Sequence, residues 1–320
     1  MYNYLCRLLL EAKTGLIYYT TPLFSKYLEG LKSEYSFFHH EAATDEKIAF
    51  ELGLAGAIAA KRTACLFSTE QIYEAMDPVM TSAYTGVKKG FLIVCIKDTP
   101  HEVSFIGPFS KLPVIYSDDI DELPQSVDFC YNISERYEIP VILQITPDEG
   151  FNGERKHTGN TREKPQINHA QFIKDPGRWA ATPSFRYKLH QLLNEKIEKI
   201  RKEFETYKGN KKEIKGKTGI ITTKHIDLDF YDEDTSLLKI STVFPLPDKL
   251  VEGFINEMDE VFLIEDEYPA VTLQIKERGK INLEIIKTPS RIQNKNEMLY
   301  GFELIRDWFG PASSINMAHG

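Results

Sequence analysis

Three mainly apolar segments, one of them a continuous apolar run, constrain the fold of this chain more than any other feature. They are TACLFS from Thr63, FLIVCIK from Phe91 and IPVILQIT from Ile139. A strand with one face in water alternates apolar and polar residues, so a continuous apolar run predicts a strand that is covered on both faces. Amphipathic helical segments separate the runs, and this alternation is typical of a parallel sheet with helices on both sides. The sequence therefore predicts an α/β fold.

The length of the chain predicts about two units, since 320 residues compare with roughly 150 for a typical domain. Polar segments suggest the boundaries: an α/β domain over 1–147, a linker loop and long connecting helix over 148–217, a smaller α/β domain over 218–288, and a C-terminal helix and tail over 289–320. Within the second segment, residues 209–217 are expected to be a plain linker.

One helix of the first domain is expected to carry the most informative acid. Thr44 is the predicted N-cap, and Asp45 and Glu46 then lie in the first turn, where acids complement the helix dipole. Gly53 and Gly56 leave one side of this helix nearly bare. A neighbouring subunit, backbone or ligand is therefore expected to approach it closely.

Composition excludes several function classes. Lys and Arg number 39 against 47 Asp and Glu, and the net charge of −8 argues against a nucleic-acid partner. The 4 cysteines form no CxxC pair, which disfavours a zinc or iron–sulfur site and suggests a reducing compartment. No apolar run is long enough to span a bilayer, and the start MYNYLCRLLLEAK lacks signal-peptide features. We expect a cytoplasmic protein.

Standard catalytic and metal-binding signatures are missing: GxGxxG, the P-loop, HExxH and GxSxG do not occur. The adjacent His39 and His40 would point to opposite faces of a strand, so a shared metal is not expected. The acidic runs at 118–119 and 265–267 are expected to be solvated loop ends.

A family resemblance rests on an ordered series of segments. ATDEKIAFELGLAGAIAAKR around Glu46 and DPVMTSAYTGVKKGFLIVCIKD after it resemble the α subunit of indolepyruvate:ferredoxin oxidoreductase, a thiamine-diphosphate-dependent 2-oxoacid:ferredoxin oxidoreductase. The resemblance continues through RYEIPVILQIT, FIKDPGRWAATPSFRYKLHQLL and LLKISTVFPLPDKLVEGFINEMDEVFLIEDE. It implies a pyrimidine-binding-type domain followed by a smaller transketolase-C-terminal-like α/β domain.

The resemblance also implies roles for three residues. Glu46 matches the glutamate that hydrogen-bonds the aminopyrimidine ring of thiamine diphosphate and shares a proton with its N1′ atom. Gly53, on the same helix, is expected to contact the cofactor. Thr21, in a Thr-Pro turn similar to that of the family, is expected to bind the substrate. The implied reaction is oxidative decarboxylation of a 2-oxoacid to an acyl-CoA.

Partners follow from what the sequence lacks. It contains no GDG motif for Mg²⁺ and diphosphate, and no cysteine-rich ferredoxin segment. The resemblance therefore implies a shortened form that works with a partner subunit carrying the GDG domain and with a ferredoxin or iron–sulfur subunit holding [4Fe-4S] clusters. A homodimer within such a hetero-oligomer is expected.

Four segments differ from the family's pattern. YYTTP stands where the family has YPGTP, so Thr20 replaces a glycine, and FSTEQIY stands in place of an MKHVG-like loop. HEVSFIG, around His101 and Ser104, replaces an SSQ-type cluster, and TTK ends at Lys224 in place of a Ser-Gly turn. Two alternatives stay open: a catalytically degenerate paralogue that acts as a structural or interaction subunit, and an unrelated α/β binding protein.

Overall fold

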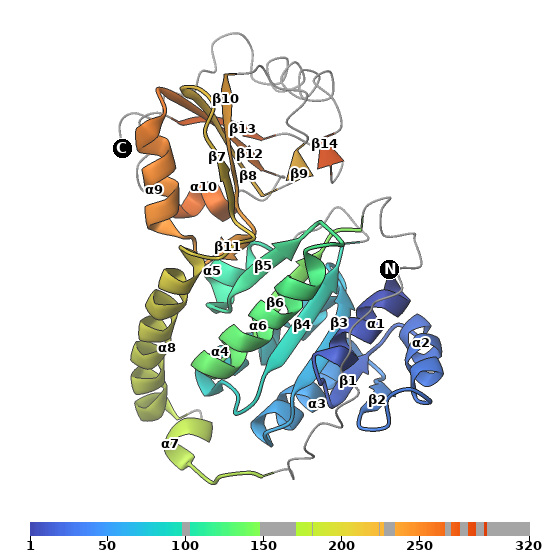
Figure 1. Ribbon diagram of the computed structural model, residues 1–320. Helices are drawn as coiled ribbons and strands as arrows, with labels where there is room; N and C mark the ends of the chain where they lie inside the picture. The colour runs from blue at the N-terminus through green and yellow to red at the C-terminus, as the bar shows by residue number, and fades with distance from the viewer. Residues whose placement is uncertain are drawn as a thin grey trace. The chain divides into compact units, whose positions relative to one another are not determined.

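The computed structural model describes residues 1–97, 103–147, 171–180, 182–223, 225–226, 234–265, 270–275, 281–285 and 291–292. The chain divides into two compact units, Met1–Ile200 and Arg201–Gly320. Figure 1 labels the helices and strands of both.

The first unit alternates strands and helices over most of its length. Its strands are β1 Leu16–Tyr19, β2 His39–Ala42, β3 Thr63–Ser68, β4 Phe91–Ile96, β5 Val114–Ser117 and β6 Val141–Ile145. Its helices are α1 Tyr2–Glu11, α2 Leu23–Leu31, α3 Glu46–Ile58, the 3₁₀ helix η1 Gln71–Ala75, α4 Met76–Thr85, α5 Ile106–Ser110, α6 Leu123–Tyr137, α7 Pro176–Trp179 and α8 Pro183–Phe204, the last of which runs past Ile200.

Strands β1 to β6 are hydrogen-bonded in the order β5-β6-β4-β3-β1-β2, and each neighbouring pair is parallel. The parallel α/β fold predicted from the apolar runs is therefore confirmed. From β1 the chain moves outward to β2 and then returns across β1 to β3. The strand order thus reverses direction between β1 and β3, and ligands of open parallel sheets bind beside such a reversal.

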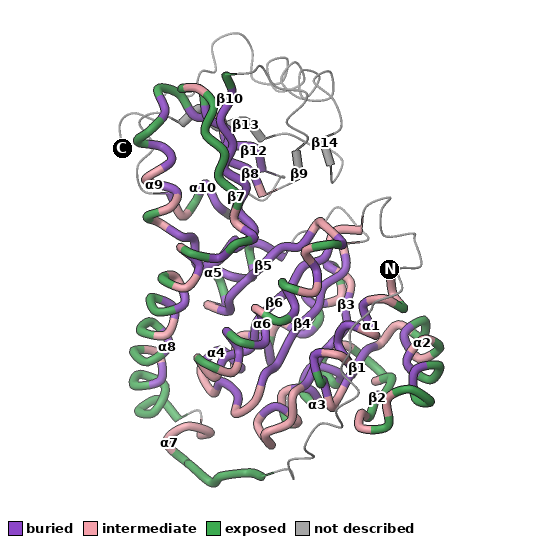
Figure 2. Tube along the Cα trace, viewed as in Figure 1, coloured by how far each residue is buried: buried purple, intermediate pink, exposed green. Residues whose placement is uncertain are grey.

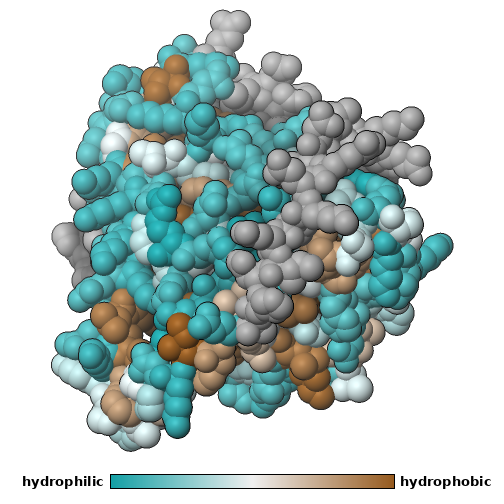
Figure 3. Space-filling model, turned by 60° about the horizontal axis from the view of Figure 1, so that its bottom comes forward, coloured by the Kyte–Doolittle hydropathy of each residue, from teal (hydrophilic) through white to brown (hydrophobic). Residues whose placement is uncertain are grey.

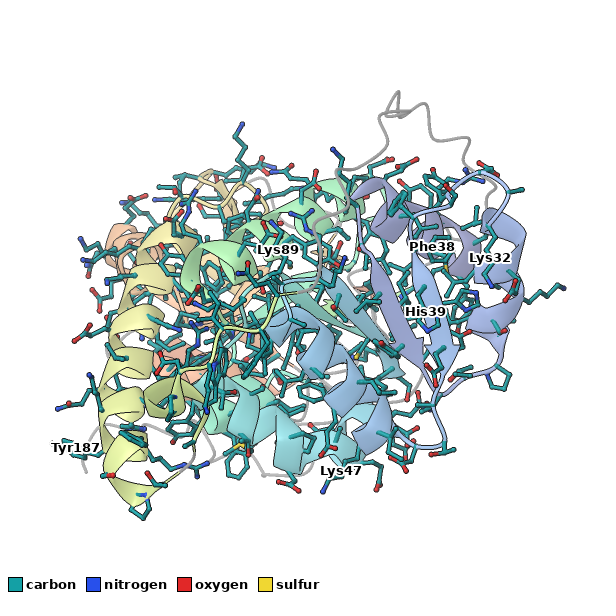
Figure 4. All side chains as sticks on the ribbon, turned by 90° about the horizontal axis from the view of Figure 1, so that it is seen from below. Lys32, Phe38, His39, Lys47, Lys89 and Tyr187 are labelled. Carbon is teal, nitrogen blue, oxygen red and sulfur yellow. The ribbon has the colours of Figure 1, made fainter. Side chains whose placement is uncertain are left out.

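Helices cover both faces of this sheet. Connections between parallel strands are right-handed, so a reversal of strand order moves the next helix to the opposite face. Helices α3 and α4 contact each other, and so do α1 and α6. Figure 4 shows α3 and α4 on one side of the strands and α1 and α6 on the other.

The core lies in the centre of the first sheet. All residues of β4 and β6 are buried, and β3 is buried up to Ser68, which explains their continuous apolar sequences. Strand β2 is an edge strand in which only His40 is buried. Figure 2 shows this difference between the central strands and β2.

The second unit has its own sheet. Its elements are β7 Lys211–Glu213, β8 Thr218–Thr222, β9 His225–Ile226, β10 Thr235–Lys239, β11 Thr242–Phe244, α9 Asp248–Glu257, β12 Glu260–Glu265, α10 Ala270–Gln274, β13 Ile281–Ile285 and β14 Arg291–Ile292. The main sheet has the order β13-β12-β8-β10-β7, parallel except for β7. The four parallel strands of this sheet are β8, β10, β12 and β13.

Several local predictions are wrong. Residues 209–217 are not a plain linker, because β7 within them pairs antiparallel with β10; its charged, exposed sequence suits the edge of a sheet. The N-cap of α3 is Asp45 rather than Thr44, since the Asp45 carboxylate accepts a hydrogen bond from Ile48 N at 2.8 Å.

The acidic run 265–267 also departs from its prediction. Glu265 is buried, and its two carboxylate oxygens accept hydrogen bonds from the backbone N–H groups of Val271, at 2.7 Å, and Thr272, at 2.8 Å. It therefore holds the first residues of α10 in place instead of facing solvent. The other two residues of the run lie outside the described residues, as do His101, Lys224 and, apart from residues 291–292, the C-terminal helix and tail predicted over 289–320.

A cluster of charges closes the amino-terminal edge of the first sheet, in the turn before β6. Glu138 accepts from Arg178 Nη1 at 2.6 Å and from Lys88 Nζ at 3.1 Å. Arg178, from the GRW segment, also donates to the backbone oxygens of Thr85, at 3.1 Å, and Val87, at 2.7 Å. Burial opposes ionisation of Glu138, but the two cations outweigh it and hold the pKa of this carboxyl below its usual value.

Candidate functional site

Polar side chains gather at the carboxyl edge of the first sheet, where the strand order reverses. Thr20 directly follows β1, Ser68 ends β3 and is followed by Gln71 at the start of η1, and Glu46 opens α3 after β2. These segments meet because β2, β1 and β3 are neighbours whose carboxyl ends share one edge. The topology alone thus makes this edge a candidate binding site.

Glu46 is fixed at the first position of α3. The connection from β2 is tied to β1 by the bond from Ala43 N to Tyr19 O at 2.8 Å, and Asp45 then caps the helix. Figure 4 labels the neighbouring Lys47 on α3 and His39 on β2. Glu46 is half-buried and lies in the first helical turn, where an acidic side chain complements the helix dipole.

One oxygen of the Glu46 carboxylate takes two hydrogen bonds. Thr20 Oγ1 donates to Glu46 Oε1 at 2.8 Å, and Gln71 Nε2 donates to the same oxygen at 2.9 Å. Gln71 Nε2 also donates to Thr20 Oγ1 at 3.0 Å, which closes a triangle of three side chains. Both donors to the carboxylate are neutral groups.

The orientation of the Gln71 amide follows from its bonds to Ser68. Ser68 N donates to Gln71 Oε1 at 2.8 Å, and Gln71 N donates to Ser68 Oγ at 3.2 Å. Because Oε1 accepts from the backbone, the amide nitrogen is the end that faces Thr20 and Glu46. The end of β3 therefore sets the direction of the bond that reaches Glu46.

The second carboxylate oxygen is available to a ligand. Among the residues that the structure describes, none donates to Glu46 Oε2, and no Lys, Arg or His forms an ion pair with Glu46. The arrangement is a half-buried carboxylate with one oxygen fixed and the other open. Chemically, it can accept a hydrogen bond from a ligand N–H or exchange a proton with a ring nitrogen.

Thr21 follows Thr20 in the chain, but its hydrogen bond is made by its backbone and not with Glu46 or Gln71. Its backbone oxygen accepts from Phe24 N at 3.3 Å, in the first turn of α2. Pro22 is the N-cap of α2, which begins at Leu23. The substrate role expected for Thr21 stays a prediction.

Gly53 is buried between α3 and its own sheet. A Cβ atom at this position would lie 2.5 Å from Cys65 Sγ on β3 and 2.9 Å from Phe91 Cε2 on β4, and at Gly56 it would lie 2.5 Å from Leu16 Cδ1 on β1. The bare side of α3 therefore permits close packing within the unit. The prediction that this face packs on another subunit is wrong, while a cofactor contact at Gly53 stays a prediction.

The sequence interpretation missed the part played by Gln71. The glutamine follows a strand by three residues and opens a short helix, and serine and glutamine at this spacing can cap each other in the manner of a capping box. That signal predicts the local turn. The contact with Glu46 depends on the strand order, which residue spacing does not reveal.

The two histidines of β2 do not form a shared site. His39 is exposed and lies 3.4 Å from Glu41, whereas His40 is buried, with Nδ1 2.8 Å from Tyr19 Oη and Nε2 3.2 Å from Glu29. Within the described residues, no group of three or more His, Cys, Asp or Glu side chains could hold a metal ion.

Comparisons with curated proteins confirm the predicted resemblance, although no family model matches the chain. The chain is 31% identical over 282 residues to indolepyruvate oxidoreductase subunit IorA of Pyrococcus horikoshii, and 28% identical over 257 residues to that of Archaeoglobus fulgidus. The matches cover 77% and 76% of this chain and 41% of each relative. The chain thus spans about two-fifths of the length of these curated relatives.

Solved structures confirm the fold. The chain is similar to 2-oxoglutarate:ferredoxin oxidoreductase from Magnetococcus marinus, with a TM-score of 0.69 and 12% identity, over 96% of this chain and 64% of that one. It is also similar to a split gene transketolase, with a TM-score of 0.57 and 11% identity, over 90% and 88%. In the described part of the chain, no helix combines the length and apolarity needed to cross a membrane.

Proposed function

We propose that this chain is a subunit of a thiamine-diphosphate-dependent 2-oxoacid oxidoreductase complex, with an indolepyruvate-like substrate. One observation carries the proposal: Glu46 lies at the strand-order reversal with one oxygen fixed and the other without a partner among the described residues. The relatives named IorA supply the substrate class and the reaction class.

The residues around Glu46 fit an aminopyrimidine ring. Such a ring needs one carboxylate oxygen opposite N1′, in a place that excludes much of the water yet stays open at the edge of the sheet. Glu46 is half-buried and keeps Oε2 for this contact, because Thr20 and Gln71 already satisfy Oε1. Thiamine diphosphate, when bound, supplies the nucleophilic carbon and the electron sink for decarboxylation.

The step assigned to this chain is a proton exchange. Glu46 Oε2 would share a proton with ring N1′, which promotes loss of a proton elsewhere on the cofactor. Thr21 would orient the substrate, and Gly53 would line the cofactor. The products of the complex would be an acyl-CoA, carbon dioxide and reduced ferredoxin.

Partners complete the proposed site. A subunit with the GDG motif would hold Mg²⁺ and diphosphate, and a ferredoxin or an iron–sulfur subunit with [4Fe-4S] clusters would take the electrons, in a cytoplasmic hetero-oligomer built on a homodimer. Exposed apolar side chains support such contacts: Phe105, the N-cap of α5, is 46% exposed, and Phe109 on α5 is 61% exposed. Figure 3 shows hydrophobic side chains gathered on the lower part of one face.

The test is a purification followed by a single substitution. The native complex is purified, its other chains are identified by mass spectrometry, and 2-oxoacid-dependent dye reduction is measured with Glu46→Gln. Losing this proton transfer should lower the rate by roughly 10²–10⁴, whereas Glu51→Gln, an exposed acid on the same helix, should leave it unchanged. Full activity of Glu46→Gln would refute the catalytic assignment.

A structural or interaction subunit is the second candidate. The observation that favours it is that Thr20 and Gln71, both in segments that differ from the family's pattern, bond directly to Glu46. Under this alternative the purified complex assembles with the chain present, and its 2-oxoacid activity is unaffected by Glu46→Gln. The same experiment therefore separates the two functions.

A further inference from the structure

We propose that Thr20 and Gln71 are positioning residues for Glu46, and this proposal rests on the function proposed above. They belong to two segments, YYTTP and FSTEQIY, that lie 51 positions apart at these residues. Both segments differ from the family's pattern, and the structure brings both differences to one atom, Glu46 Oε1. The two changes therefore act together on one carboxylate.

The donors fix the geometry of Glu46 without neutralising its charge. Thr20 and Gln71 are neutral donors, and no described cation forms an ion pair with Glu46. A carboxylate that rotates freely would present either oxygen. With Oε1 taken by two donors, Oε2 is the oxygen that remains for ring N1′.

The orientation is transmitted from the backbone of β3. Ser68 N binds Gln71 Oε1, so the amide cannot turn over without losing that bond and leaving Glu46 beside an amide oxygen. Thr20 accepts from Gln71 and donates to Glu46, so its hydroxyl proton also has one direction. Each member of the triangle thus restricts the next, and hydrogen bonds in such networks strengthen one another.

The first arm of the experiment uses the full-length chain without cofactor. The side-chain amide NMR signals of Gln71 are assigned by their loss in Gln71→Leu. We expect them to shift in Thr20→Val and in Glu46→Gln, and to stay near their original positions in Thr20→Ser, which keeps the hydroxyl. Gln191→Leu, an exposed position on α8, should leave them unmoved. If neither Thr20→Val nor Glu46→Gln moves these signals, the positioning network is refuted.

The second arm uses the purified complex at saturating thiamine diphosphate. Thr20→Val and Gln71→Leu should each lower kcat roughly ten- to a hundredfold, since a misplaced catalytic group costs up to about 10² in rate, while the KM for the 2-oxoacid changes little. Thr20→Ser should recover most of the activity lost in Thr20→Val. In a Glu46→Gln background, Gln71→Leu should cause no further loss, because it acts through Glu46.

The two proposals fail in different ways. An inactive wild-type complex, or a fully active Glu46→Gln complex, refutes the proposed function, and the NMR arm then decides whether the triangle orients Glu46. Full activity of Gln71→Leu and Thr20→Val beside a disabled Glu46→Gln refutes the positioning role and leaves the function standing. Melting temperatures of all variants identify any loss that comes from unfolding.

Discussion

Glu46 and Glu138 lie at opposite edges of the same parallel sheet, and their surroundings differ in charge. Glu138 has both oxygens bound by cations, Lys88 and Arg178. Glu46 has one oxygen bound by neutral donors, and no described cation forms an ion pair with it. A carboxylate whose two oxygens are both bound by cations holds chain segments together, while one with an open oxygen and no ion-pair partner can bind a ligand. The comparison therefore separates a structural acid from a candidate functional one.

The largest effect on stability is expected at Gly86, beside Glu138. Gly86 has φ +63°, and a Cβ there would lie 2.2 Å from Glu138 O. Gly86→Ala should therefore lower the free energy of unfolding by roughly 2–4 kcal/mol, through backbone strain and displacement of the turn. Gly30→Ala in α2, where no atom lies within 4 Å, should instead raise it by roughly 0.5–1 kcal/mol. Urea titrations measure the free energy of unfolding of both variants. Equal changes in the two variants would contradict the prediction.

Replacing each acid by its amide tests the comparison directly. Glu138→Gln should lower the free energy of unfolding by roughly 1–2 kcal/mol, because two partly buried cations lose their counter-charge. Glu46→Gln should cost only about 0.3–1 kcal/mol, since a first-turn charge is lost and no ion pair is broken. Urea unfolding measures the loss of free energy in both variants, with Glu51→Gln as the reference for an exposed acid. A larger loss at Glu46 than at Glu138 would reverse the assignment of the two edges.

The charged edge should also give a pH dependence, through Lys196. Burial, together with nearby Arg178 and Lys88, lowers the pKa of Lys196 from 10.5 to about 8. Between these values the unfolded chain holds the proton and the folded chain does not, so stability rises as pH increases from 8 towards 10.5. Lys196→Met should remove this rise. Urea unfolding curves of the wild-type chain and of Lys196→Met at several pH values check this prediction. The same rise in stability with pH in both proteins would contradict it.

The smallest effect is expected for the reactivity of the cysteines. Their labelling tests whether a reagent can reach the space between α3 and the sheet. All four thiols are free and buried, and burial raises the pKa of Cys6 to about 12 and that of Cys65, under α3, well above its usual value. A thiol reagent should react little with the native chain and with all four thiols in guanidinium. Rapid native labelling at Cys65, located by peptide mapping, would mean that α3 separates readily from the sheet.

Sequence reasoning succeeded where the pattern is local. The runs at β3, β4 and β6 predicted buried parallel strands because both faces of these strands are covered, and Glu46 was placed in the first turn of its helix. The segments around Glu46 carried the resemblance to the indolepyruvate:ferredoxin oxidoreductase family. The exact cap, Asp45 rather than Thr44, was missed because both residue types cap helices well and only backbone geometry distinguishes them.

The remaining features depend on contacts between distant segments. The partners of Glu46 come from the ends of two other strands, and only the order β3-β1-β2 brings them together. Gly53 looks like an open face in the sequence, yet Cys65 and Phe91 fill the space beside it. The sequence predicts a linker at the edge strand β7 because three exposed, charged residues carry no strand periodicity.

The triangle around Glu46 also sets an order of events during synthesis. Its members are residues 20, 46 and 71, so helix α3 can form while the third member is still inside the ribosome. The carboxylate is oriented only after Gln71 has emerged and β1 has paired with β3. Conversely, a fluctuation that separates these two strands would remove both donors from Glu46 Oε1. The direction of Glu46 Oε2 is thus a property of the assembled sheet and not of helix α3 alone.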